Sequence, residues 1–409
     1  MTSTTFSPLS LPASAPAAAR SVFRLLPRLR HGTLSLQLPD GGTALFGTLR
    51  EGELRASMRL HNWHVCAAAL HSGDIGFAES FIAGDWTSPD LSALLTLLVA
   101  NRDDIESVVY GTWWGALLYR AKHLLHRNSR RGSKKNIHAH YDLGNEFYRL
   151  WLDDTMNYSS AWFEGDRGGD MAHAQWAKVR RALAECDVRP GARVLEIGCG
   201  WGALAECAAR DFGAHVTGVT LSLEQLAYAQ RRLQDAGLAN RATLRFQDYR
   251  DLDGSDGPFD AVASIEMFEA VGREYWPGFF ETLKRQLKPG GKACIQSITI
   301  RDDLFERYVK STDFIQQYIF PGGLLPSPAA FRAAAAQAGL KVVNELAFGP
   351  DYAETLRRWH ERFRGAEGPV RRLGFDTRFM RIWEFYLAYC EAAFATGNTD
   401  VMQFTLQRE

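Results

Sequence analysis

The stretch ARVLEIGCGWGALAECAARDFG, residues 192–213, decides the fold of this chain. It opens with an apolar run typical of a buried β-strand. Gly198, Gly200 and Gly202 follow, and then a helical pattern that ends at Gly213. A strand, a glycine-rich turn and a helix in this order place backbone N–H groups where nucleotide-type ligands bind. The GxGxG spacing differs from the GxGxxG of dinucleotide-binding enzymes, so the stretch alone does not identify the ligand.

The alternation of strand and helix patterns continues on the C-terminal side of this stretch. Further strand patterns lie at 214–221, 241–248, 259–266 and 291–300. Helical patterns lie between them at 222–237, where Ser222 is the expected N-cap, and at 273–291. Such alternation predicts an α/β fold, a doubly wound and mostly parallel sheet with helices on both faces.

Polar side chains around the first and third strand patterns indicate which ligand the glycine turn binds. Glu196 stands two residues before Gly198, and an acid at that place suits a ligand with an ammonium group. Gln247, Asp248 and Tyr249 close the third strand pattern. Asp248 can accept a hydrogen bond from an exocyclic adenine amine, and Tyr249 offers a stacking face. Together they indicate S-adenosylmethionine rather than NAD.

The end of the second strand pattern departs from this scheme. Many enzymes of this kind place an acid there for the ribose hydroxyls, whereas this chain has Thr220, followed by Ser222 and Gln225. Hydroxyl and amide groups can also hydrogen-bond a ribose. We therefore expect Thr220, Ser222 and Gln225 to take part in cofactor binding.

Composition limits the classes of protein to which the chain can belong. Of its 409 residues, 46% are hydrophobic and 12% aromatic, as in a globular protein with a sizeable core. Lys+Arg and Asp+Glu are 47 each, so no global charge favours nucleic acid. The six cysteines form no CxxC pair and are expected to be reduced, mostly buried thiols of a cytoplasmic protein, with no metal site. No apolar run is long enough to span a membrane.

The N-terminal third has a different character from the rest of the chain. Residues 1–20 are rich in Ser, Thr, Ala and Pro without acids, which favours a disordered tail over a secretory signal. Residues 21–105 predict a small α+β domain, in which alternating residues flank the turn at 39–42 as in a hairpin. An aromatic helix and a basic linker occupy 106–138, and the α/β domain is expected over 139–409.

The segment 106–138 carries two interpretations. It begins with aromatic residues, and from Arg120 to Lys135 it has seven Lys/Arg and no acid. An apolar helix followed by such a basic stretch is typical of proteins that lie on an anionic lipid surface. An interdomain helix with a solvated linker has the same composition, and the sequence does not separate the two.

Seven segments in order resemble the cyclopropane-fatty-acyl-phospholipid synthase family, which includes the mycolic acid cyclopropane synthases. They are HAHYDLGNEFYRLWLDDTMNYSSAWF (138–163), VLEIGCGWGALAECAA (194–209), VTGVTLSLEQLAYAQ (216–230), RFQDYRDL (245–252), SIEMFEAVG (264–272), FIQQYIFPGGLLPS (314–327) and FGPDYAETLRRWHERF (348–363). The resemblance covers residues 138–409, and it implies a seven-stranded Rossmann-like methyltransferase sheet. Residues 21–105 resemble the lipid-binding N-terminal domain of longer members.

The resemblance implies transfer of a methyl group from S-adenosylmethionine to the double bond of an unsaturated acyl chain, in most members that of a membrane phospholipid. It places the cofactor near Tyr158, Ser159, Gly198, Gly200, Thr220, Gln225, Asp248 and Tyr249, with His140 and Tyr141 closing over it. It also implies peripheral association with the cytoplasmic face of a membrane. Relatives are often homodimers, although the sequence singles out no dimer interface.

In the family, the base that removes a proton is attributed to a bound bicarbonate. By resemblance, Glu269, Tyr352 and the backbone of Ile298 match three of its neighbours. Ser160 stands where most relatives have cysteine, and Gln296 where they have histidine. Both can hydrogen-bond a small anion, but glutamine cannot become cationic as histidine can. We therefore expect weaker anion binding, or direct use of Glu269 as the base.

Four functions are compatible with the sequence. The first is synthesis of cyclopropane acyl chains, and the second is acyl-chain methylation that gives a methylene- or methyl-branched product. A lipid-binding protein without catalysis and a small-molecule methyltransferase are the others. The complete glycine turn, Asp248 and Glu269 argue against loss of catalysis, and the lipid-type N-terminal domain argues against a small-molecule substrate.

Overall fold

The computed structural model describes residues 11–12, 14–48, 52–105 and 143–409, and these residues divide into two compact units. The first unit contains the described part of 1–125 together with 310–319 and 367–396. The second contains the described part of 126–309 together with 320–366 and 397–409. The sequence predicted a single domain over all of 139–409, whereas 310–319 and 367–396 lie in the first unit.

The first unit is built on a four-stranded sheet with the order β2-β1-β3-β4. Its strands are β1 (Thr33–Gln37), β2 (Thr43–Gly47), β3 (Arg55–Leu60) and β4 (Trp86–Thr87). Its helices are α1 (Ala17–Phe23), the 3₁₀ turn η1 (Leu26–Arg28), α2 (His64–Ala83), α3 (Leu91–Ala100), α13 (Phe314–Tyr318), α16 (Glu367–Arg372) and α17 (Thr377–Ala395). β1 and β2 pair antiparallel, as the predicted hairpin requires.

The structure of this unit differs from the sequence expectations at two places, the tail 1–20 and helix α17. Helix α1 begins at Ala17 and buries Ala19, so the disordered tail predicted over 1–20 does not extend to residue 20. Alanine is the best helix former, and a short apolar face is enough to dock such a helix. The helix α17 packs in this unit because Phe385 contacts the rings of Phe77 and Phe81 of α2. Helical periodicity predicts an apolar face but not the element that covers it.

The second unit contains a seven-stranded sheet with the order β10-β11-β9-β8-β5-β6-β7. The strands are β5 (Arg193–Ile197), β6 (His215–Thr220), β7 (Ala242–Phe246), β8 (Phe259–Ile265), β9 (Leu287–Ile300), β10 (Leu340–Ala347) and β11 (Thr399–Arg408). The five strands β7, β6, β5, β8 and β9, which are neighbours in this order, pair parallel. Strand β11 pairs antiparallel with both β9 and β10. The predicted doubly wound, mostly parallel sheet is confirmed.

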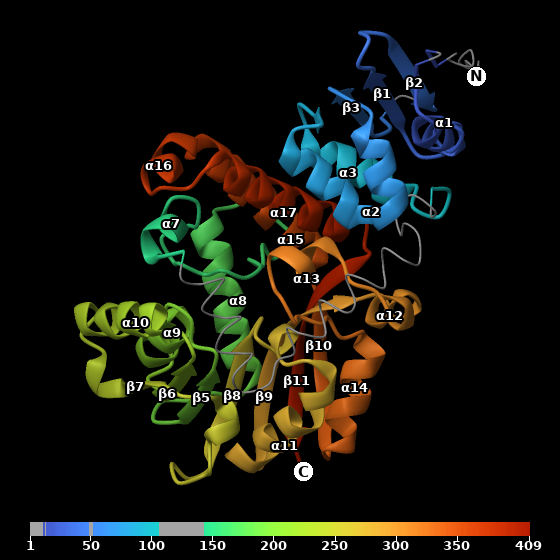
Figure 1. The fold of residues 1–409 in the computed structure, drawn as a ribbon. Coiled ribbons are helices and arrows are strands. Elements are labelled where there is room, and N and C mark those ends of the chain that lie inside the picture. Colours follow the sequence, from blue (N-terminus) through green and yellow to red (C-terminus); the bar gives the residue numbers. More distant parts are fainter. Residues whose placement is uncertain (1–10, 13, 49–51, 106–142) are drawn as a thin grey trace. The chain divides into compact units, whose positions relative to one another are not determined.

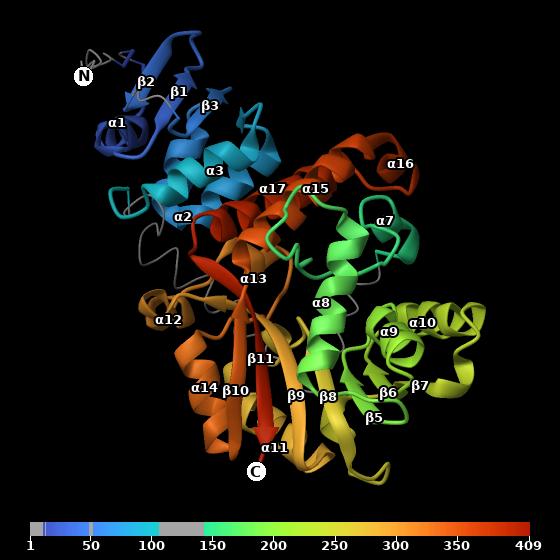
Figure 2. The same ribbon diagram turned by 180° about the vertical axis from the view of Figure 1, so that it is seen from behind.

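Helices cover both faces of this sheet. They are α7 (Asn145–Arg149), α8 (Met171–Glu185), α9 (Ala203–Asp211), α10 (Leu223–Asp235), α11 (Trp276–Gln286), α12 (Asp302–Val309), α14 (Pro328–Gln337) and α15 (Gly349–Gly365). Short 3₁₀ turns are η2 (Ala239–Arg241), η3 (Tyr249–Asp251), η4 (Phe268–Ala270) and η5 (Arg273–Tyr275). Helices α11 and α14 lie on one face (Figure 1), and α8 and α9 lie on the other (Figure 2).

The two faces of the sheet belong to separate apolar clusters. One cluster joins Phe279 and Phe280 of α11 to Phe331 of α14 and Phe404 of β11. The other joins alanines and leucines of α8, α9 and α10 to the opposite side of β5, β6 and β8. Burial on both faces explains why most residues of β5 and β8 are apolar.

All six cysteines are free thiols, and five of them are buried, as the sequence predicted. Among the residues that the structure describes, no helix is long and apolar enough to cross a membrane.

Candidate active site

A cavity lies where β5, β6, β7 and β8 end, at the carboxyl edge of the parallel strands, and this edge is where ligands of such sheets bind. Ten of the residues predicted for the cofactor line it: Tyr158, Ser159, Glu196, Gly198, Gly200, Thr220, Gln225, Gln247, Asp248 and Tyr249. The topology thus brings together side chains that are up to 91 positions apart in the chain, from Tyr158 to Tyr249.

The turn after β5 is shaped by its glycines. Gly198, Gly200 and Gly202 have φ of +86°, +48° and +83°, which favours glycine at each place. Gly202 is the N-cap of α9, and a Cβ there would stand 2.8 Å from the Cβ of Ala229. Gly202 therefore permits close packing of α9 on α10 rather than lining the cavity.

The end of β6 is organised by hydrogen bonds among the three polar residues that the sequence indicated. The hydroxyl of Thr220 lies 3.3 Å from Oε1 of Gln225 and accepts the backbone N–H of Ser222 at 3.2 Å. The hydroxyl of Ser222 accepts the backbone N–H of Gln225, as an N-cap of α10. Ser222 is thus a helix cap beside the cavity, and Thr220 and Gln225 line it.

Asp248 and Arg250 form an ion pair at the end of β7. The guanidinium of Arg250 donates from Nε at 2.9 Å and from Nη2 at 2.5 Å to the two carboxylate oxygens of buried Asp248. Burial raises the pKa of the Tyr249 hydroxyl to about 12, so this ring stays neutral. The sequence predicted Asp248 and Tyr249 for this edge, but it did not indicate Arg250.

Glu196 is fully enclosed at the start of the glycine turn. Its Oε2 atom has no hydrogen-bond partner among the residues that the structure describes. Burial raises its pKa well above the usual value for glutamate, against the opposing effects of the Ala205 backbone N–H and of Arg232. An enclosed carboxyl with an unpartnered oxygen fits a ligand that carries an ammonium group.

A second carboxyl, Glu266, occupies the centre of the site, and sequence reasoning missed it. It follows β8 directly and lines the same cavity as the glycine turn. Its Oε1 accepts the backbone N–H of Ser160 at 2.9 Å and the side-chain amide of Gln296 at 2.8 Å. Its Oε2 accepts the hydroxyl of Tyr352 at 2.7 Å. Three residues predicted around a bound anion therefore surround a carboxylate of the chain itself.

The remaining polar atoms of Ser160 and Gln296 bond to other parts of the chain. The Ser160 hydroxyl donates to the carbonyl of Ala161 at 2.8 Å. The Gln296 carbonyl accepts the side-chain amide of Gln403 at 3.0 Å, so a residue of β11 orients the amide toward Glu266. Both replacements therefore form hydrogen bonds within the chain. These bonds do not test the bound bicarbonate that the resemblance implies, which stays a prediction.

Glu269 lies on η4, next to the pair formed by Ser297 and Ile298. Its Oε1 accepts the backbone N–H of Ile298, which the sequence had assigned to the anion. Its Oε2 is buried and has no hydrogen-bond partner in the described part of the chain. Burial and the nearby Glu266 raise the pKa of Glu269 to about 8, so this carboxyl holds a proton at neutral pH.

The buried Lys178 of α8 supplies positive charge to the site. Its ammonium donates to the Ser159 hydroxyl at 2.5 Å, and Glu266 and Asp153 are the nearby carboxylates that favour its charged form. Burial lowers its pKa to about 8. The sequence gave no sign of this residue, because it lies within an otherwise ordinary amphipathic helix.

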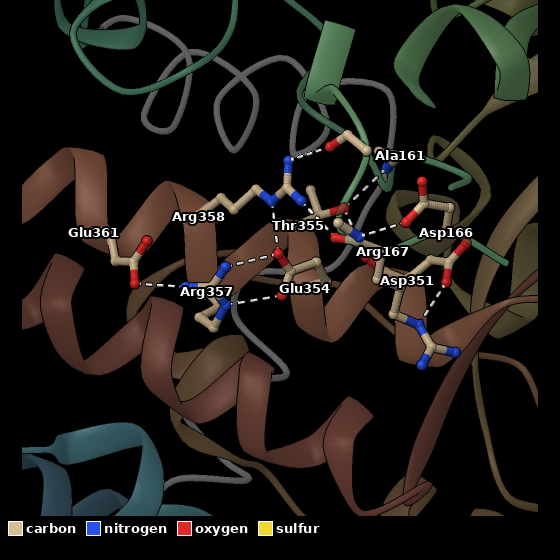
Figure 3. A network of polar contacts seen from close by, with 11 residues as sticks. Ala161, Asp166, Arg167, Asp351, Glu354, Thr355, Arg357, Arg358 and Glu361 are labelled. Carbon is tan, nitrogen blue, oxygen red and sulfur yellow. Dashed lines mark hydrogen bonds and ion pairs between the residues drawn. The ribbon is translucent and has the colours of Figure 1, made fainter. Parts of the chain in front are cut away.

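Helix α15, which carries Tyr352, is tied to the segment that carries Ser160 (Figure 3). The Asp351 carboxylate accepts the backbone N–H of Phe163 at 2.7 Å and Nε of Arg167 at 2.9 Å. The Thr355 hydroxyl accepts the backbone N–H of Ala161 at 3.1 Å. These bonds fix the positions of the two segments whose Ser160 and Tyr352 donate hydrogen bonds to Glu266.

Replacing Asp351 with alanine is expected to lower the free energy of unfolding by about 2–3 kcal/mol, because it leaves the buried N–H of Phe163 without an acceptor. Glu361→Gln is the matched control, since Glu361 pairs with Arg357 at the exposed end of the same network (Figure 3) and should change stability by less than about 0.5 kcal/mol. Denaturant unfolding of both variants checks this. Equal losses would show that Asp351 has no special role.

Three sequence predictions concern residues outside those described: His140, Tyr141 and the segment 106–138. No group of three or more His, Cys, Asp or Glu side chains among the residues placed by the structure could hold a metal ion.

Comparison with known proteins decides the family. The family model for mycolic acid cyclopropane synthetase matches residues 128–404. The chain belongs to this family. It is 42% identical over 344 residues to the tuberculostearic acid methyltransferase UfaA1 of Mycobacterium tuberculosis, which covers 82% of this chain and 79% of that protein. It is 32% identical over 364 residues to the cyclopropane-fatty-acyl-phospholipid synthase of Escherichia coli, which covers 88% of this chain and 90% of that one.

Solved structures agree with this assignment. The mycolic acid cyclopropane synthase CmaA1, in complex with SAH and CTAB, superposes with a TM-score of 0.62 at 32% identity. The match covers 67% of this chain and 98% of that chain. The protein is therefore an S-adenosylmethionine-dependent methyltransferase of the mycolic acid cyclopropane synthetase family, with the sheet and glycine turn that such enzymes share.

The cavity of this family member fits S-adenosylmethionine. Glu196 offers an unpartnered buried oxygen to the ammonium group, and the open side of Gly200 leaves space for the amino-acid part. Thr220 and Gln225 would hold the ribose, and Asp248 and Tyr249 the adenine. When bound, the cofactor supplies an electrophilic methyl group.

The raised pKa of Glu196 predicts pH-dependent binding of the product analogue S-adenosylhomocysteine. The raised pKa favours the protonated form of the free carboxyl, whereas a bound ammonium group requires the ionised form. Binding should therefore be coupled to release of a proton, and affinity should rise with pH as long as the α-amino group of the ligand stays charged. Glu196→Gln should bind about tenfold more weakly and lose the pH dependence. Calorimetry in two buffers measures both effects, and equal slopes for the two proteins would contradict the assignment.

Proposed function

We propose that the protein transfers the methyl group of S-adenosylmethionine to the double bond of an unsaturated fatty acyl chain of a membrane phospholipid. The observation that supports this most directly is the position of Glu266, whose half-buried carboxyl lines the cofactor cavity. Methylation of an alkene produces a carbocation, so the site needs a negative group nearby and then a base.

The residues around the cavity suit this chemistry. An alkene is a weak nucleophile, and water would capture the cation, so the site must exclude water. The ring of Tyr158 lines the cavity and packs against the rings of Tyr148, Trp151 and Trp359, with ring centroids 5.4–5.6 Å apart. Aromatic faces stabilise positive charge without attacking it.

The product is a cyclopropane ring in the first candidate. After methyl transfer, loss of a proton from the new methyl group lets the C–H electron pair form the third ring bond. This is the activity named for the Escherichia coli relative with 32% identity.

The second candidate is a methylene- or methyl-branched chain. If a hydride first shifts from the methylated carbon to the other former alkene carbon, loss of a proton from the methyl group gives a methylene branch and no ring. Two observations favour this product: the 42% identity with a protein named tuberculostearic acid methyltransferase, and the departure of Ser160 and Gln296 from the family pattern.

Membrane association from the cytoplasmic side is part of the proposal. The basic stretch 120–135 should bind anionic vesicles in a salt-sensitive way. Charge reversal at Arg130, Arg131, Lys134 and Lys135 should weaken vesicle binding and leave binding of S-adenosylhomocysteine intact. Co-sedimentation with phosphatidylglycerol vesicles measures the first property and calorimetry the second. A parallel loss of both would mean that the stretch supports the fold.

The experiment that tests the function is incubation of the protein with vesicles of unsaturated phosphatidylglycerol and methyl-labelled S-adenosylmethionine. We expect label in the acyl chains and a mass increase of one CH₂ group. NMR then separates cyclopropane protons from those of a methylene branch. Absence of label from the acyl chains, with cofactor binding intact, would contradict the proposal.

A further inference from the structure

The two carboxylate oxygens of Glu266 accept different numbers of hydrogen bonds. An ionised carboxylate offers about four acceptor positions, two on each oxygen. Oε1 accepts two hydrogen bonds, from Ser160 and Gln296, and Oε2 accepts one, from Tyr352. The donors are two neutral side chains and a backbone N–H, all of which favour the ionised form. Oε2 therefore retains an acceptor position for a proton.

The backbone at Glu266 is held in a conformation that L-residues avoid. Its φ is +49°, in the left-handed region that favours glycine. Its backbone N–H donates to the carbonyl of Gln296 at 2.8 Å, which fixes the turn after β8. A glutamate in place of glycine here is strained, and strained residues gather at functional sites. The position of its carboxyl in the cavity explains why a glutamate is kept in this strained conformation.

Charge separates Glu266 from its neighbour Glu269. Burial raises the pKa of Glu266, and Lys178, Tyr352, Ser160 and Gln296 oppose that rise. Glu269 has the Ile298 N–H and Ser297 as partners, and it faces the charge of Glu266 itself. When two carboxyls lie close together, they do not ionise equally easily. The one with more hydrogen-bond donors and a nearby cation ionises first. With three hydrogen-bond donors and the nearby Lys178, Glu266 is the member of the pair that ionises more readily.

We infer that Glu266 is the catalytic base of this enzyme, and that its carboxylate stands in the protein where an external anion would otherwise be needed. The inference rests on the proposed function. It assigns the proton acceptor to the residue that lines the cavity rather than to Glu269, whose position on η4 is not part of the cavity lining.

The step balances as follows. The alkene π pair forms the new C–C bond while the C–S bond breaks with its electron pair left on sulfur, so the acyl chain carries one positive charge. Oε2 of Glu266 then takes a proton from the new methyl carbon. The C–H electron pair forms the third ring bond or, when a hydride shift has first moved the positive charge to the methylated carbon, the double bond of a methylene branch. Glu266 ends as a neutral carboxylic acid and later returns the proton to solvent. The reaction needs no oxidant or reductant.

The test compares two substitutions that remove the carboxylate in different ways. Glu266→Gln keeps the shape, so methyl transfer to vesicles should fall by about 100-fold or more, and added bicarbonate or formate should not restore it. Glu266→Gly leaves a space lined by Ser160, Gln296 and Tyr352, and glycine suits the left-handed backbone. Its activity should fall as far, and bicarbonate or formate should restore at least about tenfold. The wild-type rate should be the same in bicarbonate-depleted buffer.

The control and a second readout keep the outcomes separate. Glu164 is also left-handed, with φ of +55°, and it is exposed, so Glu164→Gly relieves similar strain and should show no dependence on bicarbonate. Binding of S-adenosylhomocysteine by calorimetry shows that each variant is folded. Titration of ¹³C-bicarbonate by NMR should show binding to Glu266→Gly and none to wild type, without any cofactor or lipid.

Two results would overturn the inference: a wild-type rate that depends on bicarbonate, or a Glu266→Gln variant within about tenfold of wild type. Failure of the proposed function looks different. In that case wild type would not label acyl chains at all, while the bicarbonate titration would still report whether Glu266 fills an anion site.

Discussion

Replacing Lys178 with methionine is expected to lower the free energy of unfolding by about 3–5 kcal/mol near pH 7, because it leaves the half-buried carboxylate of Glu266 without its cation. Lys178 is fully buried, and it is the largest of the contributions that hold down the pKa of Glu266. Methionine fills a similar volume, so loss of packing contributes little. In the variant, the pKa of Glu266 rises further. The loss should therefore be small at low pH, where Glu266 is protonated, and should grow towards neutral pH. It should stop growing above about pH 8, where Lys178 itself loses its charge in the wild type.

The double variant Lys178→Met/Glu266→Gln separates charge from packing. Removing both charged groups takes away the uncompensated carboxylate, so most of the lost stability should return. Denaturant unfolding of wild type, both single variants and the double variant gives the coupling free energy. Additive losses would mean that the two residues do not interact, and that Lys178 serves only Ser159 and the helix.

The sheet and the cofactor edge could be predicted from the sequence because their signals are local. The apolar run before Gly198 and the glycine spacing specify a strand, a turn and a helix within one short segment. The ends of parallel strands must then meet at one edge, so Glu196, Thr220 and Asp248 were expected to lie together, and they line one cavity.

The C-terminal part of the chain could not be assigned in the same way. Strand β11 inserts antiparallel between β9 and β10, and α17 leaves the second unit to pack with α2 and α3. These choices depend on which apolar surfaces are complementary in space. A single sequence gives the periodicity of each element but not its partner.

Glu266 was missed although it carried a readable signal. It is the first residue after β8, in the same place relative to its strand as functional residues at the other strand ends. The family resemblance directed attention to Glu269 three residues later, because that position matches the known pattern. Only the hydrogen bonds from Ser160, Gln296 and Tyr352 show which carboxyl these residues surround.

Replacing Glu269 with glutamine is expected to change how stability depends on pH. The pKa of Glu269 is raised from 4.5 to about 8 in the folded protein, first by burial and then by Glu266. A carboxyl whose pKa is raised by folding costs no stability when the pH is below its pKa in the unfolded chain. The cost then grows with pH until the pH exceeds its pKa in the folded protein. At about 1.4 kcal/mol per pH unit, the total penalty on the wild type is on the order of 4 kcal/mol between about pH 5 and pH 8.

Glu269→Gln removes this penalty because the amide does not ionise, while its carbonyl can still accept the N–H of Ile298. The difference in unfolding free energy between variant and wild type should therefore increase in favour of the variant from about pH 5 to about pH 8. Urea midpoints at several pH values measure it, with Glu361→Gln as the exposed control that should follow the wild type. Parallel curves would mean that Glu269 is ionised in the folded protein at neutral pH. The proton of the pair would then reside on Glu266, which would remove the charge argument that makes Glu266 the base.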